Sequence, residues 1–531
     1  MTRSSSAAFD AIVIGAGANG LVAAATLGRH GKRVLLLERD QEIGGQSRAD
    51  AFAPGFRAPA TDDAGWLPPA VARELDLDPG SMVEPEMSVS VSDGDGELLT
   101  LFRDPTRAAE AIRKRSPRDA DRWAPFAARV GKLAGFLGAL YQLPPPDIDS
   151  TALRDVLPLL GLGRKLRSLG RADMIELFRV LPMPVQDLLD DTFECAPLKA
   201  AVAAGGVRDI RQGPRSGGTS FVLLHYLVGA PAGSVRARSW WRDGPHAFSS
   251  TAEAAAKRRG VTVRASADVA RITVRDDAVT GVALTGGEEI AARVVLSTAD
   301  PARTLLGLVD PVWLDPEFLH AVRNVKFRGC TAVVQYALDR LPQLPGVPDS
   351  GRALAGVVSL TPSMEALERA YDAAKYGSVL DEPHVEITVP SLRWPSLAPD
   401  GKHVLVARAQ YAPYRLRDGA TWDAGRSCAL ADAVTAAIAR VLPGFADSVL
   451  HHAILTPRDL ETRYGLTEGA VTQGELMLDQ ILFMRPVAGW GRYAMPIEGL
   501  YLAGAGAHPG PGILGGPGWL AAKRALADAR R

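Results

Sequence analysis

Phe9-Asp-Ala-Ile-Val-Ile-Gly15-Ala-Gly17-Ala-Asn19-Gly20 is the stretch that decides the fold, together with Lys32-Arg-Val-Leu-Leu-Leu-Glu38-Arg39, which follows an alanine-rich run. The first stretch is a short β-branched run that ends in Gly-x-Gly-x-x-Gly, and the second is an apolar run that ends at an acid. This pattern predicts a strand, a tight turn, a helix and a parallel strand. We expect Gly15 to form the turn, Gly17 to admit a pyrophosphate and Gly20 to let the helix lie close to the sheet.

The acid at the end of the second run has the position of a ribose ligand. Glu38 follows Gly20 by 18 residues, close to the spacing of about 20 that is typical of a carboxylate on a ribose 2′-hydroxyl. Such a carboxylate rejects a 2′-phosphate. The helix that begins after Gly17 would offer free N–H groups to the phosphates. An ordinary glycine turn is the alternative, but a strand, a helix and a second strand in register favour a dinucleotide site.

A second glycine pair, Gly44-Gly45, follows shortly after Glu38-Arg39. Glycine at these positions would let the chain pass beside the pyrophosphate again. This arrangement resembles the extended fingerprint of FAD enzymes of the glutathione-reductase-like type more than that of simple NAD dehydrogenases. We therefore expect FAD as the cofactor.

Length and composition indicate a soluble globular protein of two or three intertwined domains. The chain has 531 residues, of which 47% are hydrophobic and 23% charged, both ordinary values. Its 60 basic and 60 acidic residues give a formal net charge of zero. Nothing in this balance favours nucleic acid as a partner.

The cysteines and the N-terminus bear on localisation. Cys195, Cys330 and Cys428 form no Cys-x-x-Cys pair, so we expect neither a redox dithiol nor a zinc site, but three free thiols in a reducing compartment. No other metal site is expected. Residues 1–8 lack the apolar core of a secretory signal, and no apolar run reaches the roughly 18 residues of a membrane span. The expected location is the cytoplasm.

The middle of the chain carries helical and strand-like patterns. Residues 104–143 have helical spacing after the cap Asp104-Pro105. In residues 153–193, apolar residues recur at intervals of three and four, with basic residues on other faces. One interpretation is a basic amphipathic helix in peripheral contact with a membrane; the commoner case is a lid helix packed on its neighbours. Residues 221–228 read as a buried element lining an interior space, with His225 as a hydrogen-bonded core histidine.

The remaining patterns suggest how the domains interleave. Short strands from 260 to 300 would return the chain to the nucleotide-binding sheet, and 325–460 mixes strands and helices as a second domain would. We predict five segments: the FAD-binding domain takes 1–60, 241–310 and 476–531, and the substrate domain takes 61–240 and 311–475.

The C-terminal stretch 499–518 reads as a strand that ends in a glycine-rich loop, followed by a helix from Trp519. This helix would point a second N-terminus into the nucleotide cleft. Its dipole suits the negative charge of a reduced flavin. Coupled with the N-terminal fingerprint, the loop predicts the closing half of an FAD site.

At this point the sequence resembles the phytoene-desaturase-related flavoproteins, and within them the pyridine nucleotide-disulfide oxidoreductase domain-containing protein 2 group. The resemblance covers most of the chain and is most specific at the glycine motifs, at Pro54-Gly-Phe, in 476–486 and in 499–518. It implies an α/β fold in which a two-lobed, glutathione-reductase-like FAD-binding Rossmann domain is interleaved with an α+β substrate domain. Relatives desaturate or isomerise apolar, often isoprenoid, substrates in a tunnel that ends at the flavin.

Site roles carried over from this resemblance concern the cofactor. They assign FAD binding to Gly15, Gly17, Asn19, Gly20, Glu38, Arg39, Gly44, Gly45, Val269, Gly504, Ala505, Ile513, Leu514 and Gly515. Glu38 would bind the adenine ribose, and Val269 would contact adenine by its backbone. Two departures from the family pattern are Asp243-Gly-Pro-His246, where the family has a glycine-rich segment, and Pro511 inside the last glycine run. Both sites are expected to face the flavin or the substrate.

The predicted reaction is FAD-dependent dehydrogenation of a carbon–carbon bond in a lipophilic, isoprenoid-like molecule. A single dinucleotide fingerprint favours oxygen or a quinone over a nicotinamide as electron acceptor. The polar candidates near the flavin are His508, His246, Tyr226 and Arg485, and for each a role in holding backbone carbonyls is as good an interpretation. The alternatives are a flavin amine oxidase and a non-catalytic lipid- or prenyl-binding protein on the same scaffold.

Overall fold

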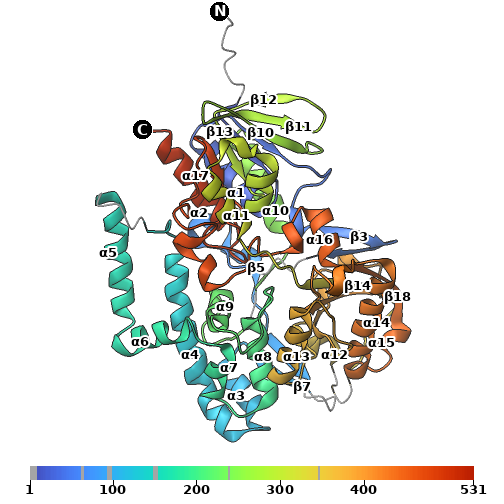
Figure 1. Cartoon of the computed structure of the whole chain (residues 1–531). Coiled ribbons are helices and arrows are strands. Elements are labelled where there is room, and N and C mark those ends of the chain that lie inside the picture. The colour runs from blue at the N-terminus through green and yellow to red at the C-terminus, as the bar shows by residue number, and fades with distance from the viewer. Residues whose placement is uncertain are drawn as a thin grey trace, which may run out of the picture.

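The computed structural model describes residues 9–60, 65–92, 98–146, 153–236, 239–344, 347 and 349–530. The N-terminal residues 1–8 lie outside these residues. The described chain forms a nucleotide-binding lobe around a parallel sheet, a second lobe around a larger mixed sheet, and a layer of helices beside them (Figure 1).

A five-stranded parallel sheet forms the centre of the first lobe. Its order is β19 (Leu500–Leu502), β13 (Val294–Ser297), β1 (Ala11–Ile14), β2 (Val34–Leu37) and β9 (Thr262–Arg264). Ile12 of β1 lies beside Val295 and Leu35, and Val295 lies beside Leu500. The strands are β-branched or leucine-rich because both faces of the sheet are covered. The apolar runs predicted at both ends of the sequence are therefore near neighbours in one sheet.

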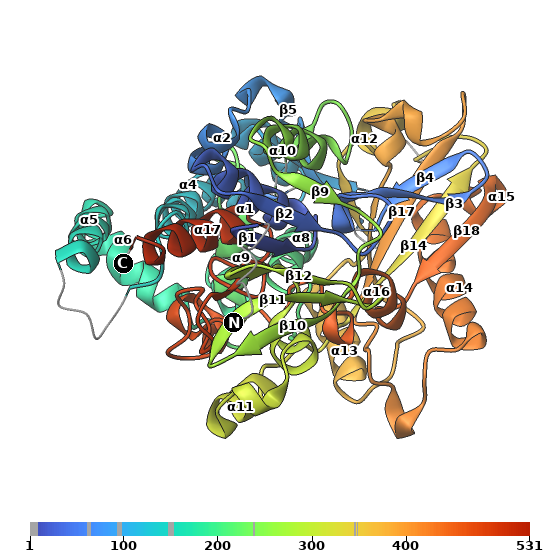
Figure 2. The same ribbon diagram turned by 90° about the horizontal axis from the view of Figure 1, so that it is seen from above.

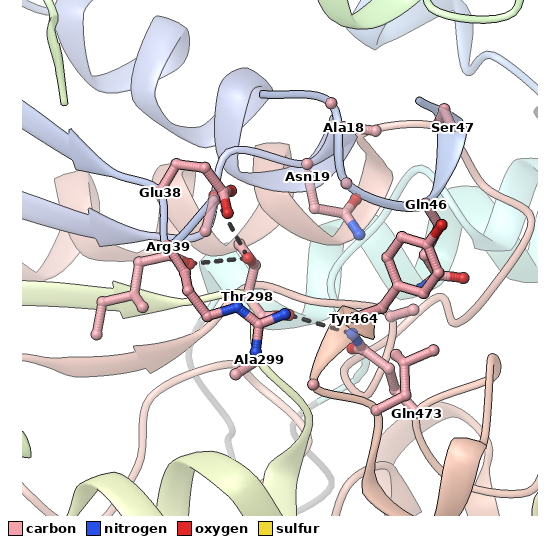
Figure 3. Close-up of a pocket in the computed structure, with 18 of the residues that line it drawn as sticks. Ala18, Asn19, Glu38, Arg39, Gln46, Ser47, Thr298, Ala299, Tyr464 and Gln473 are labelled. Carbon is pink, nitrogen blue, oxygen red and sulfur yellow. Dashed lines mark hydrogen bonds between the residues drawn. The ribbon is translucent and has the colours of Figure 1, made fainter. Parts of the chain in front are cut away.

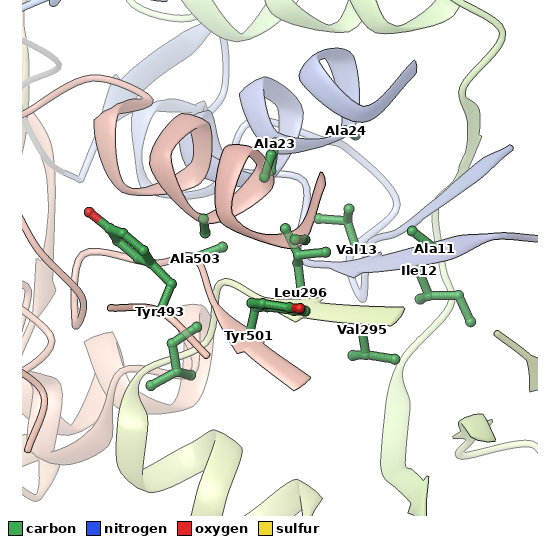
Figure 4. Packing of buried hydrophobic residues seen from close by; sticks show 14 of the residues in the cluster. Ala11, Ile12, Val13, Ala23, Ala24, Val295, Leu296, Tyr493, Tyr501 and Ala503 are labelled. Carbon is green, nitrogen blue, oxygen red and sulfur yellow. The ribbon is translucent and has the colours of Figure 1, made fainter. Parts of the chain in front are cut away.

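Helices cover one face of this sheet and a small antiparallel sheet lies on the other (Figure 2). The helices are α1 (Ala18–Arg29), α2 (Pro69–Leu75), α10 (Ala247–Arg258) and α17 (Gly516–Asp528), and the small sheet joins β10 (Val269–Arg275), β11 (Ala278–Leu284) and β12 (Glu289–Ala291). Alanines let α1 and α17 approach closely, and Figure 4 shows Ala23 and Ala24 of α1 in one core with Val13 and Leu296. A Cβ on Gly518 would lie 1.9 Å from the carbonyl oxygen of Asn19. Helices α1 and α17, which come from the two ends of the described chain, therefore pack directly against each other.

The second lobe is a seven-stranded mixed sheet. Its order is β18 (Val449–Leu455), β14 (Thr331–Leu338), β17 (His403–Gln410), β16 (His384–Thr388), β15 (Val357–Ser359), β6 (Met87–Ser92) and β7 (Leu98–Phe102). The pair of β15 with β6 is parallel and the others are antiparallel. Helix α14 (Ala424–Val441) packs its apolar face on this sheet. The remaining elements of the lobes are β3 (Ala49–Ala53), β4 (Phe56–Pro59), β5 (Met82–Val83), β8 (Trp240–Trp241), α11 (Pro316–Arg323), α12 (Ser350–Ala353), α13 (Met364–Lys375), α15 (Phe445–Ser448) and α16 (Pro457–Tyr464).

The helical layer differs from the two long helical runs expected from sequence. Residues 104–143 form α3 (Pro105–Arg113) and α4 (Pro117–Leu140), because Ser116 caps a new helix at Pro117. Residues 153–193 form α5 (Leu153–Ser168), α6 (Arg171–Val180) and α7 (Val185–Asp190), with breaks at Gly170, whose φ is 83°, and at Pro184. Two further helices, α8 (Ala196–Gly206) and α9 (Thr219–Leu227), complete the layer.

Helices α5 and α6 pack on their neighbours, as expected of lid helices: Leu162, Leu166, Leu177 and Val180 join the core of the helical layer. Their outer surface leaves Leu160, Ile175 and Phe178 more than half exposed. Contact of this surface with a membrane stays a prediction. Among the described residues, no helix combines the length and the apolar character that a membrane span requires.

The predicted domain division also stays a prediction. The strands fall on the expected sides of its boundaries, since β1, β2, β9, β13 and β19 share one sheet. The core around that sheet, however, also contains Val71 and Leu75 of α2 and Phe318 and Leu319 of α11. The nucleotide-binding core thus extends past residues 60 and 310.

Candidate functional site

A cavity of about 310 Å³ lies at the carboxyl ends of the parallel strands. The segments that leave β1, β2 and β13 supply Gly15, Glu38 and Thr298 to its wall, and the C-terminal loop supplies residues 510–515. Ligands of open α/β sheets bind at this edge because the chain leaves the strands there and turns into helix N-termini. The two terminal motifs therefore line one cavity.

The glycines of the wall allow backbone segments to approach closely. Gly15 has a φ of 92°, which L side chains rarely adopt. Gly45 has a φ of 59°, and a Cβ there would lie 3.2 Å from Cα of Gly17. Gly17, Gly44 and Gly45 line the cavity, so the first and second glycine motifs form one surface.

Two predicted cofactor contacts are not in the described wall. Gly20 is buried beneath the turn, where a Cβ would lie 1.9 Å from the carbonyl oxygen of Gly15. Gly504 is buried too, and a Cβ there would lie 2.3 Å from the carbonyl oxygen of Thr298. Both glycines act in packing, because they let a helix or loop approach a neighbouring strand end. The other predicted contacts line the cavity: Gly15, Gly17, Asn19, Glu38, Arg39, Gly44, Gly45, Val269, Ala505, Ile513, Leu514 and Gly515.

The carboxylate of Glu38 is held by backbone amides. It accepts hydrogen bonds from the N–H groups of Ala16 at 2.7 Å and Asp40 at 3.0 Å. These bonds fix the side chain at the end of β2, facing the cavity. Arg39 donates to the carbonyl oxygen of Arg463, at the end of α16, so this rim of the cavity joins segments from both lobes.

The wall fits a dinucleotide cofactor such as FAD. Helices α1 and α17 begin at Gly17 and Gly515, and neither has a side-chain cap among the described residues. At α1 the first N–H groups are therefore available to phosphate oxygens, whereas at α17 the N–H of Gly516 donates to the carbonyl oxygen of Ile513 and Pro517 has no N–H. The buried Oδ1 of Asn19 has no hydrogen-bond partner in the described chain, and a ligand hydroxyl would satisfy it.

Sequence reasoning missed several residues of the wall. Gln473 donates to the carbonyl oxygen of Thr298 at 3.2 Å and accepts from the N–H of Gly506 at 2.9 Å, which ties β13 to the last glycine loop. Tyr464 of α16 donates to Asp50 at 3.1 Å. Figure 3 shows these residues around the same space as Asn19 and Glu38. They belong to no recognisable motif, and only the assembled lobes bring them to the site.

A second cavity of about 870 Å³ adjoins the first, since Gly65 and Gly512 line both. Its inner wall is mainly apolar and is built from Trp66, Leu67, Pro69, Ala72, Leu77, Met82, Val228 and Ala230. Four charged residues also contribute, and all four are exposed: Arg29, Arg73, Asp76 and Asp78. Tyr226, which was expected near the flavin, lines this cavity and comes from the buried helix α9.

His225, the neighbour of Tyr226, fixes the loop between the two cavities. Its Nε2 lies 2.8 Å from the carbonyl oxygen of Pro511, and its Nδ1 lies 2.8 Å from the hydroxyl of Tyr141. Because a carbonyl only accepts, Nε2 carries the proton and Nδ1 accepts from Tyr141. The prediction of a hydrogen-bonded core histidine is confirmed. Pro511, one departure from the family pattern, lines the first cavity.

The other polar candidates line neither cavity. Arg485 is buried and donates to the carbonyl oxygens of Thr472, Gly474, Gln480 and Ala505. This confirms its alternative role as a holder of backbone carbonyls. His246 is exposed at the start of α10. Neither it nor the rest of 243–246 lines either cavity, so the expectation that this segment faces the flavin or the substrate stays a prediction.

His508 is buried behind the Pro511 loop and lines neither cavity. Desolvation lowers its pKa to about 3, against smaller opposing effects of hydrogen bonds to the backbone of Leu143 and Leu140. The ring is therefore neutral in the folded protein at neutral pH. Its role is packing beside Tyr141, whose ring centroid is 5.9 Å away.

The lowered pKa of His508 predicts acid sensitivity. Below pH 6.5 the unfolded chain binds a proton on this residue that the folded chain does not bind until about pH 3. Stability therefore falls as the pH drops through this window, by up to about 1.4 kcal/mol per pH unit from this group. Urea unfolding between pH 6.5 and 5 is expected to show a shallower pH dependence for His508→Gln than for the wild type. The exposed control His246→Gln should keep the wild-type slope; equal slopes for all three proteins would contradict the assignment.

Comparisons with known proteins agree with this geometry. Residues 19–525 match the model of the flavin containing amine oxidoreductases. Pyridine nucleotide-disulfide oxidoreductase domain-containing protein 2 of Rattus norvegicus is 34% identical, over 98% of this chain and 94% of that protein. The neurosporene-forming phytoene desaturase of Rhodobacter capsulatus is 24% identical, over 97% and 93%. Among solved structures, a putrescine oxidase with redesigned cofactor binding superposes with a TM-score of 0.58 at 14% identity, over 98% of this chain and 99% of that one.

Proposed function

Because the chain belongs to the family of flavin containing amine oxidoreductases, with FAD as its cofactor, we propose that it dehydrogenates a carbon–carbon bond of a lipophilic, isoprenoid-like small molecule. Bound FAD supplies a hydride acceptor. The glutathione-reductase-like plan of the nucleotide-binding lobe is part of the proposal, supported by a parallel sheet with helices on one face and an antiparallel sheet on the other.

The observation that carries the proposal is the 870 Å³ cavity that shares Gly65 and Gly512 with the cofactor cavity. Its size falls in the range of small-molecule sites, and most of its inner wall is aliphatic. An apolar molecule there loses contact with water along much of its length. Similarity to a protein named as a phytoene desaturase, over most of both chains, supports the same substrate class.

The chain's own residues orient the substrate and shape the junction. His225 holds the Pro511 carbonyl and so fixes the loop that separates the two cavities. Tyr226 places its ring against this loop, since a Cβ on Gly512 would lie 3.2 Å from its Cε1. We assign no catalytic base. Oxygen or a quinone as the electron acceptor belongs to the proposal, because one dinucleotide motif is present.

Amine oxidation is the second candidate because of the family model. Recognition of an amine beside a flavin is favoured by an aromatic cage. Trp66 and Tyr226 are the aromatic residues other than histidine in the described wall of the larger cavity, and aliphatic residues make up more of it. The wall therefore favours the lipophilic substrate.

Anaerobic mixing with substrate panels tests the proposal. We expect terpenoids such as limonene and squalene to bleach the flavin absorbance, and putrescine and cyclohexylamine to leave it unchanged. Ala72→Phe fills the larger cavity and should slow bleaching about tenfold or more at unchanged FAD content. The exposed Ala527→Phe on α17 is the matched control. Bleaching by the amines alone would replace the proposal with amine oxidation, and bleaching unaffected by Ala72→Phe would place the substrate elsewhere.

A further inference from the structure

A third, small cavity of about 30 Å³ lies against the seven-stranded sheet. Glu386 and Thr388 of β16 and Val406 and Arg408 of β17 line it. Glu386 lies opposite Arg408, and Thr388 opposite Val406. Because alternate residues of a strand share a face, these four side chains form one patch of the sheet. Neither the cofactor cavity nor the larger apolar cavity includes them.

Apolar residues make up much of the described wall of this cavity, and its charged residues are mostly cationic. Arg208, Arg393 and Arg408 contribute three guanidinium groups, and Glu386 contributes the one carboxylate. That carboxylate forms an ion pair with Arg236, whose Nη1 lies 2.7 Å from Oε1 of Glu386. Burial raises the pKa of the Glu386 carboxyl, but neighbouring charges, with the guanidinium of Arg236 foremost, lower it by more. Asp209 forms ion pairs with Arg208 and Arg408.

The side chains of Arg208 and Arg408 are largely buried. The side chain of Arg208 is 11% exposed and that of Arg408 is 16% exposed. Guanidinium groups kept in such surroundings are stabilised by a bound anion, which they recognise with short, paired hydrogen bonds. A space of about 30 Å³ holds one or two water-sized groups, which is the size of the oxygens of a carboxylate or phosphate but not of a larger ligand.

The cavity lies next to the larger apolar cavity. The guanidinium carbon of Arg208 lies 5.5 Å from the centre of the ring of Tyr226, and Tyr226 lines the apolar cavity beside Gly512. An acid group at Arg208 would thus be one aromatic ring away from an apolar chain in that cavity. The two cavities share no lining residue, so a molecule with an apolar body and an acidic end occupies both only when the ring of Tyr226 turns aside.

We propose that Arg208, Arg393 and Arg408 bind the acid group, carboxylate or phosphate, of an amphipathic substrate whose apolar body occupies the neighbouring cavity. This inference rests on the proposed function, since it adds an acidic end to the lipophilic substrate. The alternative for these arginines is a purely structural role, in which they join the helical layer to the sheet.

Binding of model amphiphiles to the FAD-loaded protein tests the inference without turnover. The probes are dodecanoate, dodecyl phosphate, dodecylammonium and inorganic phosphate, measured by titration calorimetry. We expect one or both of the first two to bind, and dodecylammonium and inorganic phosphate to bind at least tenfold more weakly. Arg408→Gln and Arg393→Gln should each weaken the binding of the alkyl acid at least tenfold. Arg340→Gln is the control, since that side chain is 60% exposed.

Two outcomes overturn the proposal. Equal affinity of the acids for the wild type and the arginine variants would leave a structural role only. Tight, arginine-dependent binding of inorganic phosphate without binding of either alkyl acid would make this a free-anion site. If Arg408→Gln does not fold, Arg393→Gln decides, because Arg393 donates to the carbonyl oxygen of Ala355 whereas Arg408 forms an ion pair with Asp209. If the acids bind in a way that depends on the arginines, but no compound of the substrate panel bleaches the flavin, only the proposed reaction is contradicted.

Discussion

Glu38→Arg is expected to abolish FAD binding while leaving a folded chain. The carboxylate is held toward the cofactor cavity by the amides of Ala16 and Asp40. Replacement by a guanidinium removes the acceptor for the ribose hydroxyl and places a cation at the end of β2. Loss of the charge-assisted hydrogen bond to that hydroxyl costs about 3 kcal/mol, which corresponds to a loss of FAD affinity of about 100-fold, and the larger arginine side chain adds to this loss. The measurement is the FAD content of the purified variant, by absorbance.

A matched charge reversal elsewhere shows whether the loss of FAD is specific to residue 38 or follows from any replacement of glutamate by arginine. Glu289→Arg lies on β12, where the carboxylate is 63% exposed and pairs with Arg271. An exposed pair contributes little, so this variant should keep its full FAD content. Full yellow colour in Glu38→Arg would contradict the assignment of the ribose site.

Gly20→Ala is expected to destabilise the nucleotide-binding lobe as a whole. A Cβ at residue 20 would lie 1.9 Å from the carbonyl oxygen of Gly15, which belongs to the backbone and cannot rotate away. Helix α1 would have to move from β1 and from α17. We expect a loss of about 3 kcal/mol or more in the free energy of unfolding and a drop in Tm of about 5 °C or more.

The control for this variant is another helical glycine. Gly131 lies in α4, and a Cβ there would meet nothing within 4 Å. Gly131→Ala should therefore stabilise the protein by up to about 1 kcal/mol, because alanine is the better helix former. If Gly20→Ala were as stable as Gly131→Ala, the close contact between helix and turn would not exist in solution.

The sequence predicts those parts of the site that depend on neighbouring residues in the chain, and it does not predict those that depend on contacts between distant segments. The turn at Gly15, the helix after Gly17 and the acid at Glu38 follow from local patterns of glycine, apolar and acidic residues, and the structure places them as expected. Local patterns also give the short strands of the second lobe. They fail where a helix run is interrupted, because Ser116 and Gly170 were not recognised as boundaries.

The rest of the site arises from contacts between distant segments. Gln473 reaches Thr298 and Gly506, and Tyr141 reaches His225 and, through it, Pro511. Nothing in the residues around Gln473 or Tyr141 indicates these partners. The same holds for Arg208 and Arg408, whose cavity forms only when the helical layer meets the seven-stranded sheet. Sequence patterns therefore predict the cofactor site better than the substrate site.

We expect one FAD to bind between the two ends of the chain, with its adenine end at Glu38 and Val269 and its ring at the junction marked by Gly512. A crystal structure of the FAD-loaded protein is the most direct test. We expect the ribose to lie within hydrogen-bond distance of Glu38, the pyrophosphate at the N-terminus of α1, and the isoalloxazine ring between the Pro511 loop and the apolar cavity. A ring bound away from Gly512, or an FAD in the reverse orientation, would contradict this expectation.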